Sequence, residues 1–227
     1  TEDSFHELLA DGVNIQEYSD VEVALSSLVD GSYIKTLFVD PATLNYSLYS
    51  VLNQQYVVLG TSPVGLRKSV KNDVEIAGMK EAHLEDGLAV ERFLYWLQTS
   101  VEAGDAINEY EASRKLHEFR SEIEGFRGES FETISAYGPN AALPHYVTPE
   151  EESAELYAEG LYLCDSGGQY LFGTTDITRT VPLGPCSQLE KEDYTLVLKG
   201  HIALAKAVFP KGTAGCQLDV LAREPLW

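Results

Sequence analysis

Residues 161–180, LYLCDSGGQYLFGTTDITRT, place two aspartates in or beside two short strand-like runs. Leu161–Cys164 is apolar, and Thr174–Val181 is rich in β-branched residues, a pattern that is typical of strands. Glycines between the two runs give the backbone the freedom that a tight connection needs. We therefore expect Asp165 and Asp176, eleven positions apart, to stand on neighbouring strands.

Two acids on paired strands suggest a cation between them. Facing like charges destabilise a sheet, and a divalent metal ion would relieve the repulsion between Asp165 and Asp176. The alternative is that each aspartate caps a turn through its own backbone, as strand-end aspartates often do. Spacing by itself leaves both interpretations open.

The composition argues against two classes of partner. The chain has 227 residues, 44% of them hydrophobic, which is enough for one or two domains with a real core. It carries 16 basic and 36 acidic residues, a net charge of −20, whereas nucleic acids and anionic membranes are bound by basic surfaces. No apolar run approaches the roughly 18 residues of a membrane span. We therefore expect neither a nucleic-acid nor a membrane partner.

The cysteines indicate a reducing compartment. Cys164, Cys186 and Cys216 are an odd, sparse set without a CxxC pair or a disulfide framework. Such usage is the default of cytoplasmic proteins, so we expect a cytoplasmic location.

Hydrophobic periodicity divides the chain into two kinds of region. Before residue 60 it predicts helices at 19–28 and 42–52 and strands at 35–39 and 55–59, part of an α/β layer. Residues 61–72 are predicted to be a junction, because Pro63 breaks regular structure. The later region is predicted to contain helices at 72–104, 109–125 and 190–209 and strands at 132–137, 141–147, 161–164 and 174–181.

Four of the histidines fall on these elements. His83 and His117 are expected at the surface or boundary of their helices, and His201 is expected to pack in the core. His145 lies on the expected strand 141–147.

Residues 165–180 resemble the metal-binding signature of the aminopeptidase P and prolidase metallopeptidases, the pita-bread enzymes. Three further segments resemble the same family in the same order: residues 62–75 the junction before its catalytic domain, residues 138–146 the segment with its substrate-site histidine, and residues 197–203 its next helix. The form GTTD is most similar to the large aminopeptidase P group. The resemblance covers the chain from about residue 19 onward.

The resemblance implies a dinuclear metal site. Asp165 would chelate one ion and Asp176 would bridge two, and oxygen-rich ligation suits Mn²⁺, the expected metal, or Mg²⁺ or Co²⁺. His145 would contact the substrate and stabilise the tetrahedral intermediate; the alternative is a strand histidine satisfied by its neighbours. The family's other ligands, a histidine and two glutamates, would lie beyond Trp227. We therefore expect a fragment at both ends that by itself is inactive and binds metal poorly.

The implied fold class is α+β. Residues 1–67 would be the C-terminal part of a preceding α/β domain with its linker, and residues 68–227 the first half of a pita-bread catalytic domain. The implied activity is removal of the N-terminal residue from peptides with proline at the second position. A prolidase or creatinase-like hydrolase of the same fold and a non-catalytic pita-bread module that binds peptides or proteins remain the alternatives. Whether the protein forms a homodimer stays open.

Overall fold

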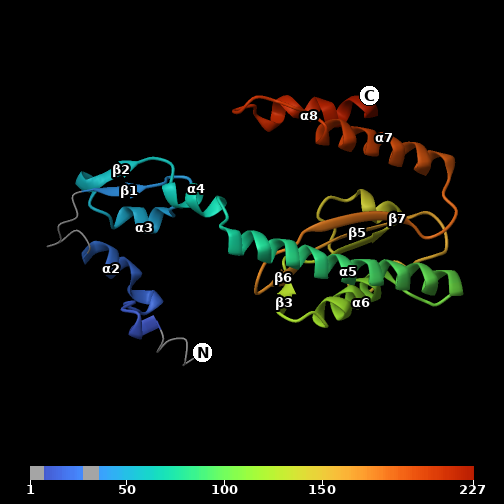
Figure 1. Cartoon of the computed structure of the whole chain (residues 1–227), viewed down its shortest axis with the longest axis horizontal. Helices are drawn as coiled ribbons and strands as arrows, with labels where there is room; N and C mark the ends of the chain where they lie inside the picture. Colours follow the sequence, from blue (N-terminus) through green and yellow to red (C-terminus); the bar gives the residue numbers. More distant parts are fainter. Residues whose placement is uncertain (1–7, 28–35) are drawn as a thin grey trace. The chain divides into compact units, whose positions relative to one another are not determined.

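The computed structural model describes residues 8–27 and 36–227 (Figure 1). The chain forms two compact units, Thr1–Lys71 and Asn72–Trp227. The domain boundary that the sequence predicts between residues 67 and 68 stays a prediction. No helix within the described ranges combines the length and apolar character that crossing a bilayer requires.

The first unit contains a two-stranded parallel ribbon with short helices. Its elements are η1 (Tyr18–Asp20), α2 (Val21–Ser27), β1 (Leu37–Val39), α3 (Tyr46–Ser50), η2 (Gln54–Tyr56), β2 (Val57–Leu59) and α4 (Pro63–Ser69). Parallel strands need a crossover connection, and the segment with α3 supplies it between β1 and β2. The predicted strand–helix–strand order is confirmed with shorter elements, while residues 28 and 35 of the predicted elements lie outside the described residues.

Helix α4 corrects the prediction of an irregular junction. Pro63 does not break the structure here, because it occupies the first turn of the helix, where its missing N–H would have no partner in any case. The Ser62 side chain caps the same end by accepting a hydrogen bond from the Val64 backbone N–H.

The second unit is a mixed α+β structure. Its elements are α5 (Asp73–Ala103), α6 (Glu109–Ser121), β3 (Phe126–Glu129), β4 (Ile134–Tyr137), η3 (Gly138–Ala142), β5 (Leu161–Ser166), β6 (Gly168–Tyr170), β7 (Ile177–Pro182), α7 (Gln188–Ala205), α8 (Gly215–Arg223) and η4 (Glu224–Leu226). Capping boxes begin α5 at Asn72, α6 at Asn108 and α7 at Ser187. The three predicted helices are confirmed, although the second ends at Ser121 rather than at residue 125.

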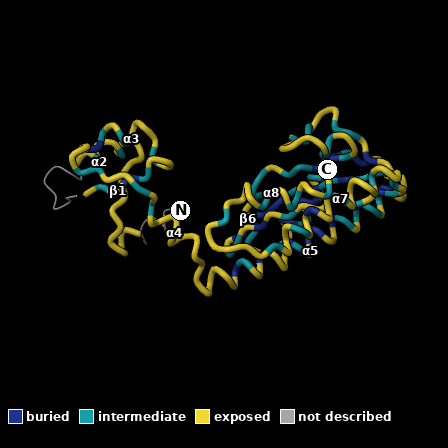
Figure 2. The backbone as a smooth tube through the Cα atoms, turned by 90° about the horizontal axis from the view of Figure 1, so that it is seen from above, coloured by how far each residue is buried: buried dark blue, intermediate teal, exposed yellow. Residues whose placement is uncertain are grey.

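The sheet β4–β5–β7 is antiparallel, with β5 in the centre. Along β5 the alternation of the strand divides the side chains: Tyr162, Cys164 and Ser166 are buried, and the residues between them are half-buried. The buried face packs on α5 and α6, where Phe93 lies 6.4 Å from Tyr162 between ring centroids. Figure 2 shows the buried positions that recur along α5 in dark blue. The opposite face of β5, which carries Asp165, therefore points away from this helical layer.

Helix α7 packs on α8 and η4 at a close approach. A Cβ added at Gly200 would lie 2.2 Å from the Ala222 carbonyl oxygen, so glycine permits this contact between the helices. The apolar stripe of α7 stays exposed, with Val197 at 59% and Ile202 at 46%. The prediction that His201 packs in the core is wrong, because no described element covers that side of α7 and His201 is exposed.

Candidate active site

The two signature aspartates come together at neighbouring strands, as the sequence predicts. Asp165 lies in β5 opposite Thr178 of β7, and Asp176 directly precedes β7, two residues before Thr178. Residues two apart in a strand share a face, so Asp165 and Asp176 are diagonal neighbours on one face of the sheet. Such neighbours are about 7–8 Å apart between Cα atoms, close enough for both carboxylates to approach one cation.

Arg179 lies on the other face. Arg179 pairs across the sheet with Cys164, and the Cys164 side chain is buried against the helices. Arg179 and Asp176 are three positions apart, so they lie on different faces of the sheet. Within the described residues the Arg179 guanidinium forms no ion pair and donates only to the Thr178 carbonyl oxygen, at 2.8 Å.

One carboxylate oxygen of the pair lacks a partner. Asp165 Oδ1 is buried and accepts no hydrogen bond from the described residues, whereas Asp176 is exposed. A buried carboxylate oxygen without a partner is costly, and a bound cation would satisfy it. Oxygen donors of this kind fit Mn²⁺, Mg²⁺ or Ca²⁺ better than a soft metal.

The aspartates by themselves make an incomplete metal site. No group of three or more His, Cys, Asp or Glu side chains converges anywhere in residues 8–27 and 36–227. Asp165 and Asp176 could therefore supply two ligands of a metal centre but do not complete one within the described residues.

The structure places His145 differently from the prediction. The segment 141–147 does not return as a strand; it continues η3 into a turn, and His145 is exposed there with φ of 53°. Pro139 at the start of η3 and Pro144 before His145 each lack the N–H that a ladder would use. Element η3 packs against β4 and β5, so the turn lies beside the strand of Asp165. His145 is therefore not a strand histidine, and its contact with substrate stays a prediction.

Sequence reasoning missed Glu109, which is fully buried at the first turn of α6. Its carboxylate accepts from the Tyr137 backbone N–H at 2.6 Å, from Asn140 Nδ2 at 3.0 Å and from the Tyr146 hydroxyl at 2.7 Å. An acid directly after an N-cap such as Asn108 is common, because its negative charge interacts favourably with the positive end of the helix dipole. Nothing in the sequence therefore distinguished Glu109 from other acids at such positions.

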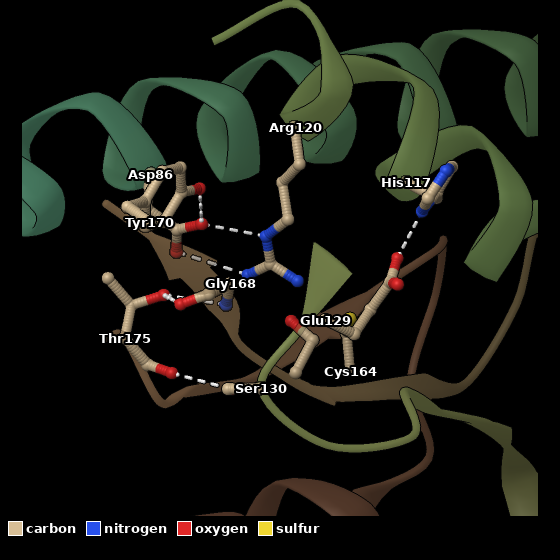
Figure 3. A network of polar contacts seen from close by, with 10 residues as sticks. Asp86, His117, Arg120, Glu129, Ser130, Cys164, Gly168, Tyr170 and Thr175 are labelled. Atoms are coloured by element: carbon tan, nitrogen blue, oxygen red, sulfur yellow. Dashed lines mark hydrogen bonds and ion pairs between the residues drawn. The ribbon is translucent and has the colours of Figure 1, made fainter. Parts of the chain in front are cut away.

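A second buried network joins helices α5 and α6 to strand β6, which pairs with β3 (Figure 3). Arg120 of α6 forms a two-pronged ion pair with Asp86 of α5, Nε to Oδ1 at 2.7 Å and Nη2 to Oδ2 at 3.1 Å. The Tyr170 hydroxyl of β6 donates to the same Asp86 Oδ1 at 2.6 Å. Burial, and then the bond to Asp86, raise the pKa of Tyr170, so its hydroxyl stays a donor. His117 and Glu129 add a hydrogen bond between α6 and β3, and His117 is half-buried as predicted.

The connection between the two aspartates is tightly packed. The Thr175 hydroxyl accepts from the Gly168 N–H at 2.8 Å, and Ser130 Oγ donates to the Thr175 carbonyl oxygen at 2.9 Å, bonds that Figure 3 also shows. A Cβ at Gly167 would lie 2.1 Å from the same carbonyl and 2.2 Å from Ser130 Oγ. Glycine at 167 thus allows the backbone of Thr175, next to Asp176, to lie against the end of β5.

We expect Gly167→Ala to lower the free energy of unfolding by about 1–3 kcal/mol, because the added methyl group has no space and the backbone must shift. The matched control is Gly87→Ala in α5, where nothing lies within 4 Å of the added Cβ. That control should raise stability by about 0.8–1 kcal/mol through helix propensity. Urea denaturation checks both, and equal effects of the two substitutions would contradict the close approach at Gly167.

Comparison with known proteins now places the chain in a family. Residues 77–227 match metallopeptidase family M24, two thirds of the chain. The chain belongs to metallopeptidase family M24. Residues 1–75 match the creatinase/prolidase N-terminal domain.

The individual proteins most relevant to this M24 chain carry the name aminopeptidase. Aminopeptidase P1 of Arabidopsis thaliana is 43% identical, covering 95% of this chain and 40% of the relative, and Aminopeptidase P1 of Lotus japonicus is 47% identical, covering 84% and 32%. The crystal structure of X-prolyl aminopeptidase from Caenorhabditis elegans, described as a cytosolic enzyme with a di-nuclear active site, superposes with a TM-score of 0.90 at 37% identity. The superposition covers all of this chain and 38% of the Caenorhabditis elegans chain. The M24 chain thus spans about two fifths or less of these relatives.

These matches confirm the resemblance and the expected fold class. The second unit is the first half of a pita-bread domain, and the first unit is part of an α/β domain of the creatinase N-terminal type.

Proposed function

We propose that the whole protein is a cytosolic Xaa-Pro aminopeptidase that releases the N-terminal residue from peptides with proline at the second position. The observation that carries this proposal is the placement of Asp165 and Asp176 on one face of the sheet, with the buried Asp165 Oδ1 lacking a partner. The similarity to proteins named aminopeptidase P and X-prolyl aminopeptidase supports the substrate class.

The site would hold a pair of divalent ions, and Mn²⁺ is the proposed metal. Asp165 and Asp176 are the residues of this chain that would hold it, and carboxylate oxygens suit that metal. When bound, such a pair supplies Lewis acidity and lowers the pKa of water towards neutrality. The di-nuclear site of the Caenorhabditis elegans enzyme supports the number of ions.

His145 and Tyr146 would contact the substrate and position that contact, respectively. His145, whose imidazole is exposed and without a hydrogen bond to any described residue, would donate to the developing oxyanion or to the carbonyl of the proline side. Tyr146, beside it, is tied into the Glu109 network and so fixes the backbone from which His145 projects.

The test is hydrolysis of a tripeptide with proline in the second position by the complete protein, beside the same peptide with alanine there. We expect cleavage of the first bond of the proline peptide alone, loss of activity on chelation, and recovery with Mn²⁺. Cleavage confined to Xaa-Pro dipeptides would instead indicate a prolidase. Binding of the proline peptide without cleavage would indicate a non-catalytic pita-bread module.

We expect His145→Ala to lower kcat for the proline peptide by roughly 10²–10³-fold, the usual effect of removing one oxyanion donor. The matched control is His83→Ala on α5, because His83 is exposed and its ring contacts only the Met79 carbonyl of its own helix. Steady-state kinetics on both variants check this. A kcat of His145→Ala within a factor of three of the control would exclude this role.

A further inference from the structure

The loop that carries His145 is held by a single buried carboxylate. We propose that Glu109 is a positioning residue that clamps the His145 loop (residues 138–146) and thereby fixes the backbone of His145 for the reaction. The inference rests on the proposed function, because that function gives His145 its role at the substrate.

Glu109 is a buried acid. Its side chain is 0% exposed, and no Lys, Arg or His within the described ranges pairs with it. A buried carboxylate without a cation needs other compensation. Here the hydrogen bonds and the N-terminal end of α6, where Glu109 is the first residue, provide it.

The hydrogen-bond donors to Glu109 come from both ends of the His145 loop. Tyr137 directly precedes the loop and donates its backbone N–H, while Tyr146 ends the loop and donates its hydroxyl. Asn140 donates from the middle to both carboxylate oxygens, at 3.0 and 3.2 Å, and Asn140 Nδ2 also lies 3.1 Å from the Tyr146 hydroxyl. One side chain on α6 therefore joins the beginning, the middle and the end of the loop.

The Tyr146 hydroxyl remains a hydrogen-bond donor to Glu109. Burial, followed by the hydrogen bond to Glu109, raises the pKa of Tyr146 to about 12. The phenol therefore keeps its proton at neutral and mildly alkaline pH and stays a donor to the carboxylate.

His145 is the third residue of a turn that the Tyr146 backbone N–H closes on the Leu143 carbonyl oxygen at 3.2 Å. Its φ of 53° is in the left-handed region, which the third residue of a turn with proline in second place commonly adopts. The imidazole has no hydrogen-bond partner in the described residues, so beyond the turn itself the nearest attachment to another element is the Tyr146 hydroxyl. The next one is Thr148, whose hydroxyl accepts from the Ser135 N–H at 3.1 Å. Loss of the Tyr146 hydroxyl bond would leave this turn without its attachment to Glu109 of α6.

The experiment compares Glu109→Gln and Tyr146→Phe with His145→Ala in the complete protein. We expect kcat for the proline peptide to fall by up to about 10²-fold, because a misplacement of a substrate-contacting group by about 1 Å can have an effect of that size. The matched control is Tyr157→Phe, since the exposed Tyr157 donates to the exposed Glu155 at 2.8 Å and should leave kcat unchanged.

The double variants decide between positioning and general support. If Tyr146 and Glu109 act through His145, adding either substitution to His145→Ala should lower kcat by less than a further factor of two. A merely structural role would instead multiply the two losses. Multiplied losses in the double variants overturn the proposal.

A second readout does not depend on the reaction. Amide hydrogen exchange of residues 138–146 should accelerate at least tenfold in Tyr146→Phe and Glu109→Gln, while residues 161–166 of β5 stay protected. Unchanged exchange in the His145 loop overturns the clamp whatever the activity. If the wild-type protein cleaves no Xaa-Pro peptide, the proposed function is wrong, and hydrogen exchange alone then decides whether Glu109 holds the loop.

Discussion

Replacing Asp165 by Asn in the complete protein is expected to lower kcat/KM for a proline-containing peptide by roughly 10³-fold or more. The amide keeps the size of the carboxylate but loses its charge and one anionic oxygen for the metal. Several kcal/mol of transition-state stabilisation depend on a catalytic metal, and about 4 kcal/mol corresponds to that factor. Steady-state kinetics and metal content, each at saturating Mn²⁺, check the expectation.

The same substitution should have a different effect on the metal-free protein. There Asp165 Oδ1 is buried without a partner, beside the second carboxylate of Asp176. Removing the charge should leave the free energy of unfolding unchanged or raise it, whereas in the metal-loaded protein it should lower it. Asp193→Asn on α7, an exposed acid, is the control that should change neither quantity. Destabilisation of the metal-free protein by Asp165→Asn would contradict a site built for a cation.

Replacing Asp86 by Ala is expected to lower the free energy of unfolding by about 3–5 kcal/mol, because Arg120 is then left buried without its partner. Arg120 is 0% exposed, and its Nη1 already lacks a described acceptor. Tyr170 would lose its acceptor as well. Guanidinium denaturation of the variant checks the loss.

An exposed ion pair between the same two helical segments is the matched control. Arg92 of α5 contacts Glu122, the residue that follows α6, at 2.7 Å, with both side chains about half exposed. Glu122→Gln should cost less than about 1 kcal/mol. Should Asp86→Ala fail to fold, the triple variant Asp86→Leu/Arg120→Met/Tyr170→Phe, which removes every partner, should recover most of the stability. If Asp86→Ala lowers the free energy of unfolding no more than Glu122→Gln does, the buried Asp86–Arg120 pair is no more important for stability than the exposed pair, and the prediction is wrong.

Local patterns in the sequence were sufficient for the elements that position the metal ligands. The β-branched run after Asp176 and the apolar run before Asp165 predict two strands, and β5 and β7 are those strands. Period-two alternation then places the acids on one face, because the side-chain direction in a strand depends only on the residue position. Helical periodicity likewise predicted the long helices α5 and α6.

The predictions failed where a residue's role depends on partners distant in sequence. His145 was expected on a strand, yet it lies in a turn that Glu109, more than thirty positions earlier, holds in place. His201 was expected in the core from its apolar stripe, but a stripe shows only which face can be buried and not whether another element covers it.

The sequence by itself therefore determined the family, the α+β fold class and the candidate metal ligands, since these depend on local spacing and on a contiguous motif. Only the tertiary structure decided that Asp165 has a buried oxygen without a partner, that Asp86, Arg120 and Tyr170 form one network, and that Glu109 holds the His145 loop. The physical reason is that burial and hydrogen-bond pairing arise from contacts between segments far apart in the chain, which no local pattern encodes.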